Sequence, residues 1–230
     1  MNSNKPVYLL AGGRGSNDPS PIFRAVLNDM GKKSPTIAYV GAASGDNADF
    51  LGRMEAMLKQ AGDCRLVHAS LSAPNADVKK ARDILQSADA VFVSGGDVER
   101  GMQVLEEKGI LSIFPELYKQ GKLFFGISAG SIMLAVEWVR WKDPDDDSTA
   151  ELFPCLGIAP VICDTHGEPE WEELKAALKL KRVGSYGYGI TSGTCLKVLP
   201  DGKVEALGGA VYKYARRKDE VQRQADLLPD

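Results

Sequence analysis

The stretch FFGISAGS, from Phe124 to Ser131, decides how this chain is expected to fold. Its first half is apolar, as in a strand that is buried on both faces of a sheet. Its second half consists of small residues around one hydroxyl group, that of Ser128. The residues from Gly130 to Val136 can continue as a helix. The stretch therefore predicts a buried strand, a sharp turn and a helix in succession.

The same alternation of strand and helix extends back toward the start of the chain. The clearest strand patterns lie at Val7–Leu10, Thr36–Val40, Ala90–Ser94 and Leu123–Ile127. Helical patterns lie at Ile22–Met30, Asn47–Gln60, Asp77–Gln86 and Glu99–Lys108. Strands that alternate with helices form parallel crossover units. We therefore predict an α/β fold with three layers, in which helices cover both faces of a doubly wound, mostly parallel sheet.

Beyond residue 136 the pattern changes. Thr194–Leu199 and Val204–Leu207 flank a Pro-Asp-Gly turn and predict a C-terminal β-hairpin. A further strand is expected at Val211–Ala215, and the acidic segment Lys142–Thr149 is expected to be a surface loop. The charged segment Arg216–Asp230 is expected to be either a frayed tail or a helix that faces a partner.

The composition narrows the classes of function. Hydrophobic residues make up 44% of the 230 residues and charged residues 26%, so we expect one globular domain over residues 1–230 with its core at about 5–215. A formal net charge of −3 gives no reason to expect a nucleic-acid partner. No apolar run approaches the roughly 20 residues of a membrane-spanning helix, and no secretory segment is evident. We therefore predict a cytoplasmic protein without a membrane partner.

The cysteines and histidines argue against disulfides and metal binding. The four cysteines show no C-x-x-C pair, and the two histidines, His68 and His166, form no ligand-like cluster with them. We expect buried thiols, no metal and no cofactor.

The residues Gly126–Gly130 fit the pattern G-x-S-x-G, in which small neighbours permit a strained turn between a strand and a helix. Such a turn presents the Ser128 hydroxyl group at the carboxyl edge of the sheet, where open α/β sheets bind ligands. The N–H group of Ala129, at the helix N-terminus, can then stabilise an oxyanion. The alternative is a tight turn of residues that are small for steric reasons alone.

Two other glycine turns follow strands at the same predicted edge. In VSGGD, residues 93–97, Gly95 or Gly96 can supply a second oxyanion donor. Asp97 is expected to contact substrate or to cap the following helix. Gly13, in the turn GGRG, is also expected to contact substrate. This turn lacks the lysine and threonine of a phosphate-binding loop and the spacing G-x-G-x-x-G.

A nucleophilic serine needs a base, and the chain offers two histidines. His166 lies in CDTHGE, among polar residues after a predicted strand at Ile158–Cys163, which suits an exposed position at a sheet edge. His68, in RLVHAS, fits a half-buried residue at the end of a strand. His166 is therefore the preferred general base for Ser128, and His68 is the alternative.

Taken together, GISAGS, VSGGDVER and DTHGE resemble the serine peptidase family that contains aspartyl dipeptidase (dipeptidase E) and cyanophycinase. AYVGAASGDNADF is similar to that family's second strand and the loop after it, so the resemblance covers about residues 7–200. It implies a flavodoxin-like fold similar to class I glutamine amidotransferases. It also implies Ser128 as nucleophile, His166 as base, and Gly95 or Gly96 with Ala129 as oxyanion hole. Relatives cleave peptide bonds next to aspartate, or the aspartyl-arginine units of a storage polymer.

The sequence departs from that family at the third catalytic position. Relatives tend to carry an acid in a strand of the type G-I-D-E-x-T-A-L, where this chain has GITSGTCL, with Thr191 and Ser192 in its place. Ser192 can accept a hydrogen bond from His166, or Asp164 or a glutamate after the histidine can supply the charge. Thr191 is expected to contact substrate. The segment EPEWEEL, where relatives have an arginine-rich stretch, would repel an aspartyl side chain if it lined the site.

These residues predict a serine hydrolase that cleaves a short peptide or amide through an acyl-enzyme. An esterase of the α/β-hydrolase type would need the order serine, acid, histidine and an H-G-G-G segment, and glutamine amidotransfer would need a thiolate at the elbow. The alternative is a catalytically weakened homologue that binds a small ligand or serves as an assembly partner. A homodimer is the default expectation for its oligomeric state.

Overall fold

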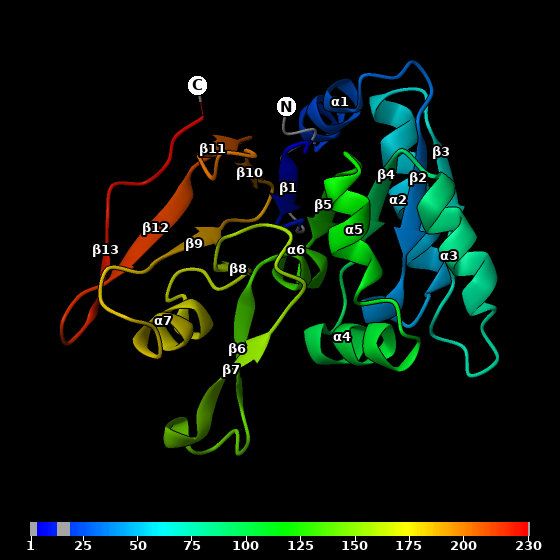
Figure 1. The fold of residues 1–230 in the computed structure, drawn as a ribbon. Helices are drawn as coiled ribbons and strands as arrows, with labels where there is room; N and C mark the ends of the chain where they lie inside the picture. Colours follow the sequence, from blue (N-terminus) through cyan, green and yellow to red (C-terminus); the bar gives the residue numbers. More distant parts are fainter. Residues whose placement is uncertain (1–3, 13–18, 230) are drawn as a thin grey trace.

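The centre of the molecule is a seven-stranded sheet with the strand order β11-β10-β1-β5-β4-β2-β3 (Figure 1). The structure, a computed structural model, describes residues 4–12 and 19–229. The strands are β1 Val7–Leu10, β2 Thr36–Val40, β3 Arg65–His68, β4 Ala90–Val93, β5 Leu123–Ile127, β10 Cys195–Val198 and β11 Val204–Leu207. β1 to β5 are parallel to their neighbours among themselves, whereas β10 and β11 form an antiparallel hairpin beside β1. The predicted mostly parallel sheet and C-terminal hairpin are confirmed.

Helices cover both faces of this sheet. Successive side chains of β4 alternate between the faces, so that Val91 and Val93 belong to one apolar cluster and Phe92 to the other. On the Phe92 side lie α1 Ser20–Met30 and α2 Ala48–Ala61. On the opposite side lie α3 Val78–Ser87, α4 Val98–Glu107, α5 Ile113–Lys119 and α6 Ala129–Leu134. The predicted three-layer α/β arrangement is confirmed.

The polar residues before three helices explain why these helices begin where the sequence predicts. Asn47, Asp77 and Asp97 each accept a hydrogen bond from the backbone N–H group three residues later. These side chains satisfy an N–H group that has no partner within the helix. Each of the three helices consequently begins within one residue of its predicted start.

The chain after α6 builds a smaller sheet with the strand order β13-β12-β9-β8 and a separate hairpin of β6 and β7. The bounds are β6 Glu137–Trp141, β7 Ala150–Pro154, β8 Cys163–Thr165, β9 Tyr186–Ile190, β12 Val211–Arg216 and β13 Val221–Arg223. Helix α7, Glu172–Lys179, packs on this sheet through a cluster centred on Trp171 and Leu174. The β6–β7 hairpin projects from the body in Figure 1, and its acidic loop is exposed at residues 142–148, as predicted.

Two predictions for this part of the chain are wrong. The strand predicted at Ile158–Cys163 begins only at Cys163 and ends at Thr165, because Pro160 has no N–H group for a ladder. Over residues 216–229 the charged C-terminal segment is neither frayed nor helical, since β13 pairs with β12 and Leu227 pairs with Val211. Backbone pairing requires no apolar side chains, so an edge strand can be highly charged.

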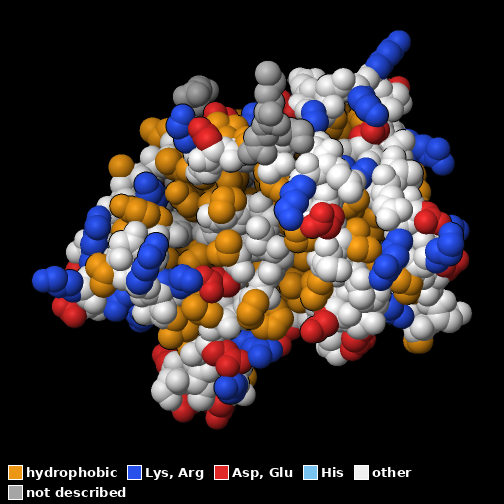
Figure 2. Space-filling view, in the orientation of Figure 1, with side chains coloured by type: hydrophobic (Ala, Val, Ile, Leu, Met, Phe, Trp, Pro, Cys, Tyr) orange, Lys and Arg blue, Asp and Glu red, His pale blue; other side chains and the backbone are white. Residues whose placement is uncertain are grey.

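Within the described ranges, no helix is both long enough and apolar enough to cross a bilayer. On the face shown in Figure 2, positively and negatively charged side chains are interspersed.

Candidate active site

Ser128 lies at a strained turn between β5 and α6. Its backbone angles are φ 53° and ψ −124°, a region that residues other than glycine seldom occupy. The carbonyl oxygen of Leu10 fixes this turn, because it accepts hydrogen bonds from the Ser128 N–H group at 2.8 Å and from Ser131 Oγ at 2.7 Å. The partly exposed Ser128 side chain is thus held at the carboxyl end of the central strand.

Steric contacts explain why residues 126 and 130 of this turn are glycines. A Cβ atom on Gly126 would lie 2.5 Å from the carbonyl carbon of Gly130, and a Cβ atom on Gly130 would lie 2.1 Å from the carbonyl oxygen of Val93. Any larger residue would push the helix away from the sheet. The small residues are therefore required by packing, and the same packing presents Ser128.

Gly95 lies next to Ser128. A Cβ atom on Gly95 would be 3.2 Å from the Ser128 Cβ atom. Gly96, with φ 141°, packs instead against the carbonyl group of Ala43, in the short 3-10 helix Ala42–Ser44. Among the described residues, no backbone carbonyl accepts a hydrogen bond from the N–H groups of Gly95, Gly96 or Ala129. All three remain available as donors.

His166 follows β8 directly and lines the same cavity as Ser128. This cavity has a volume of about 760 Å³. The Nδ1 atom of His166 lies 3.4 Å from Ser192 Oγ. No hydrogen bond joins the His166 ring to Ser128 within residues 4–12 and 19–229. The structure therefore places the predicted nucleophile and base on the wall of one cavity, with the predicted third residue in contact with the base.

The Glu168 carboxylate contacts the backbone of Ser192. The backbone N–H group of Ser192 donates a hydrogen bond to Glu168 Oε1 at 2.8 Å. Asp164, by contrast, is only 2% exposed and accepts a hydrogen bond from the Thr165 N–H group at 2.7 Å. Burial, together with the charges of Glu173 and Glu168, raises the pKa of Asp164 to about 7. Near neutral pH, Asp164 is therefore only partly ionised and is a weak source of negative charge.

The residues predicted to contact substrate have other contacts or lie outside the description. The Asp97 carboxylate accepts a hydrogen bond from the Arg100 N–H group at 2.7 Å as the N-cap of α4. Thr191 Oγ1 donates to the Ala210 carbonyl oxygen at 3.1 Å. Gly13 lies outside the described residues. Their contacts with substrate stay predictions.

The chain matches a known protein family over most of its length. Residues 7–205 match the family described as Peptidase family S51. The chain belongs to this family. The resemblance predicted from the sequence motifs is thereby confirmed, and the family makes peptide hydrolysis the general functional assignment.

Two relatives of this family member illustrate the match. It is 29% identical over 226 residues to the protein named uncharacterized peptidase YgaJ of Bacillus subtilis (strain 168). The matched region covers 94% of this chain and 95% of that protein. It is 27% identical over 206 residues to Peptidase E of Streptomyces coelicolor, which covers 84% of this chain and 79% of that protein.

Solved structures share the fold of this family member. A crystal structure of a peptidase from an acI-B1 Actinobacterium has a TM-score of 0.69 at 14% identity and covers 98% of this chain and 97% of that one. A putative Peptidase E protein from Listeria monocytogenes EGD-e has a TM-score of 0.60 at 15% identity, with coverage of 88% and 98%. At this identity the likeness concerns the fold alone.

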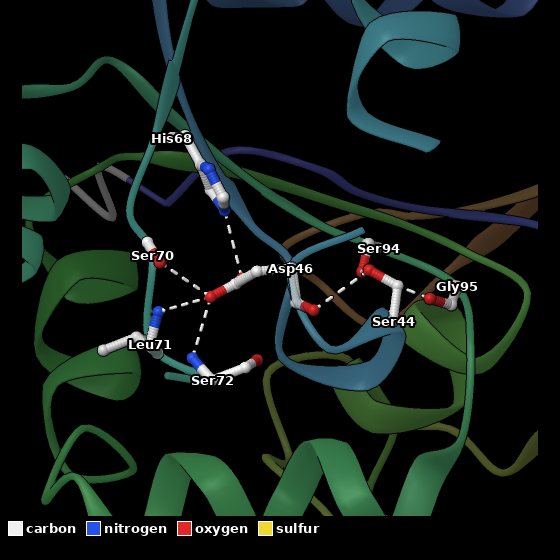
Figure 3. Close-up of polar contacts among 9 residues, drawn as sticks. Ser44, Asp46, His68, Ser70, Leu71, Ser72, Ser94 and Gly95 are labelled. Carbon is white, nitrogen blue, oxygen red and sulfur yellow. Dashed lines mark hydrogen bonds and ion pairs between the residues drawn. The ribbon is translucent and has the colours of Figure 1, made fainter. Parts of the chain in front are cut away.

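Sequence reasoning missed the partner of the other histidine in this peptidase family member. His68 Nε2 lies 3.0 Å from Asp46 Oδ1. Asp46 Oδ2 accepts hydrogen bonds at 2.8 Å from Ser70 Oγ and from the N–H groups of Leu71 and Ser72 (Figure 3). Asp46 is far from residues 68–72 in the sequence, so no local pattern pointed to these contacts.

The Asp46 carboxylate is held ionised. Burial alone would raise its pKa, but the hydrogen bonds from His68 and from residues 70–72 outweigh burial and keep the pKa well below its usual range. Neither His68 nor Asp46 is among the described residues that line the Ser128 cavity. We therefore interpret this pair as the anchor of the loop after β3.

His166 also lines a second hollow, of about 340 Å³. The carboxyl-bearing residues of this hollow are Asp164, Glu168, Glu170, Glu172 and Glu173. In the part of the chain that the structure describes, no group of three or more histidine, cysteine or acidic side chains is arranged to hold a metal ion.

Proposed function

We propose that this peptidase family member is a serine hydrolase that cleaves a short peptide or amide bond, with Ser128 as nucleophile and His166 as general base. The observation that supports this most is the strained backbone of Ser128, which lines the same cavity as His166. Strain at a functional residue is kept where the surrounding structure requires it.

The reaction proceeds in two halves. Ser128 Oγ attacks the carbonyl carbon of the substrate while His166 accepts the hydroxyl proton. The C–N bond then breaks as His166 returns this proton to the leaving amine, which leaves an acyl ester on Ser128. Water attacks the ester, gives one proton to His166, and releases the acid as Ser128 regains its proton. The N–H groups of Ala129 and of Gly95 or Gly96 stabilise the oxyanion in both halves.

Ser192 replaces the usual acid as the partner of His166. A hydroxyl group can accept the Nδ1–H hydrogen bond and hold the ring, but it carries no charge to stabilise the imidazolium ion. In a serine triad, neutralising the acid lowers turnover by about 10⁴-fold, because the imidazole takes the wrong tautomer and its cation is less stabilised. The Glu168 carboxylate behind Ser192 offsets part of this loss. The proposed enzyme is therefore a slow hydrolase.

The alternative is a weakened homologue that binds a small ligand. One observation favours it, namely that His166 contacts a hydroxyl group and, among the described residues, no carboxylate. An active nucleophile and a binding protein differ in whether Ser128 reacts.

A fluorophosphonate probe tests the proposal. The Ser128 oxygen should form a bond to phosphorus and displace fluoride, and peptide mass spectrometry should locate the adduct on Ser128. Ser128→Ala should abolish the adduct and His166→Ala should slow its formation strongly. Failure of the wild-type protein to react between about pH 6 and pH 9 would favour the binding protein.

A further inference from the structure

The cavity beside Ser128 has mostly apolar walls. Helix α1 contributes Ile22 and Phe23, and helix α2 contributes Phe50, Met54 and Met57. Strands β1 and β5 add apolar residues at their ends. Among the described residues, no aspartate or glutamate lines this cavity. Its volume of about 760 Å³ suits a small ligand, and an apolar side chain gains free energy by leaving water there.

Arg53 supplies the permanent charge on the described part of the cavity wall. It is exposed, and its guanidinium group lies 5.5 Å from the centre of the Phe50 ring. None of the ion pairs among the described residues involves Arg53. An arginine that pairs with no carboxylate among the described residues can bind the carboxylate of a ligand.

The second hollow that His166 lines has the reverse character. It is lined by acidic side chains, including Glu168 and Glu170, which disfavour a carboxylate there. An anionic group on a ligand at Ser128 is therefore directed toward Arg53.

We propose that the cavity binds a short peptide whose apolar side chain lies between α1 and α2 and whose terminal carboxylate is bound by Arg53. This names the substrate class of the proposed hydrolase and rests on that function for the attack by Ser128, but peptide binding itself can be measured without catalysis.

The test measures peptide binding to Ser128→Ala protein by calorimetry. Ala-Leu-Ala is compared with Ala-Asp-Ala, and a tenfold or larger preference for the leucine peptide is expected, about what a hydrophobic pocket achieves. Met57→Asp, a change on the partly exposed wall, should weaken binding of the leucine peptide. Equal binding of the two peptides, no binding of either at millimolar concentration, or no effect of Met57→Asp would each overturn the inference.

A second arm tests Arg53. Amidation of the peptide C-terminus should weaken binding about fivefold, the scale of an exposed ion pair. Arg53→Met should bind both forms equally, and Arg53→Lys should restore part of the difference. Arg65→Met, at the exposed amino end of β3, is the matched control and should behave as the parent protein does. The same effect of amidation in Arg53→Met would contradict the role of Arg53.

The two proposals can fail separately. Fluorophosphonate labelling of the wild-type protein reports on Ser128 alone, whereas the calorimetry reports on the cavity alone. Labelling without a leucine preference rejects the substrate class only, and a leucine preference without labelling rejects the hydrolase only.

Discussion

The two histidines of this peptidase family member have opposite kinds of partner. His68 contacts the partly buried, ionised carboxylate of Asp46, which also holds the loop after β3. His166 contacts the hydroxyl group of Ser192 and lies on the cavity that contains Ser128. The strongly bonded histidine is thus the structural one in our account. The comparison teaches that a histidine paired with aspartate does not identify a catalytic site unless a reactive group lies within the same cavity.

Two aspartates repeat this contrast. Burial opposes the ionisation of both, but Asp46 receives several hydrogen bonds, whereas Asp164 lies near Glu173 and Glu168. The pKa of Asp46 is therefore lowered and that of Asp164 is raised to about 7. Asp164 is the more deeply buried of the two and lies near other carboxylates, whereas Asp46 is partly exposed and receives more hydrogen bonds, so Asp46 is the one that stays charged.

The largest expected effect separates the two histidines. His166→Ala should slow fluorophosphonate labelling of Ser128 by about 10³-fold, because it removes the general base. His68→Ala, measured at a temperature where the variant stays folded, should change the rate by less than about tenfold, because His68 does not line the cavity. Similar losses in the two variants would erase the distinction between them.

Asp46→Asn should lower the free energy of unfolding by about 3 kcal/mol. The new amide group removes the charge and turns a donor toward groups that already donate to this position. Urea denaturation measures the loss, and Asp49→Asn, at an exposed position in the first turn of α2, should cost less than about 1 kcal/mol. Equal costs would show that Asp46 is not an anchor.

Asp164 should make stability depend on pH in the direction opposite to Asp46. Its pKa is about 7 in the folded protein, against an ordinary value of 3.8, so the unfolded chain releases this proton first as pH rises. Stability from protonated Asp164 is therefore present at low pH and lost between about pH 4 and pH 7. Over that range the wild type should lose about 3 kcal/mol more than Asp164→Asn in urea denaturation. If the free energy of unfolding depended on pH in the same way in both proteins, the pKa of Asp164 would not be raised in the folded protein.

For Asp46 the direction is reversed, because its folded pKa is lowered. Its contribution is complete above the ordinary pKa of an aspartate and is lost as pH falls below that value. The stability difference between the wild type and Asp46→Asn should therefore shrink in acid.

The smallest expected effect concerns Ser192. Ser192→Ala should lower the labelling rate of Ser128 about tenfold, since His166 loses its hydrogen-bond partner. Ser192→Asp should raise the rate about tenfold, because a carboxylate stabilises the imidazolium ion. Ser148→Asp, in the exposed β6–β7 loop, should leave the rate unchanged. If Ser192→Ala labels as fast as the wild type, Ser192 does not position His166.

Local patterns were enough to predict the central fold and the candidate nucleophile. These patterns depend on residues that are close together in the sequence. They are the apolar strands of the first half, the capping residues of three helices and the small residues around Ser128. The contacts that complete the site act across longer separations. The Ser192–Glu168 hydrogen bond joins residues that are 24 positions apart.

The same reason explains the errors near the C-terminus. Pairing of β13 with β12 depends on backbone groups, which every residue carries, so side-chain pattern did not reveal it. The Asp46 anchor likewise depends on where the loop after β3 lies. Neither the strand pairing nor the Asp46 contacts follow from a periodic pattern in the local sequence.

The central claim is that Ser128 carries the acyl group during hydrolysis, and trapping that group tests it most directly. Wild-type protein mixed with N-acetyl-leucine 4-nitrophenyl ester and quenched in acid should carry an acetyl-leucyl ester on Ser128, located by peptide mass spectrometry. The ester should form at the wild-type rate in His68→Ala and far more slowly in His166→Ala. An acyl group on another residue, or equal rates in the two histidine variants, would contradict the account.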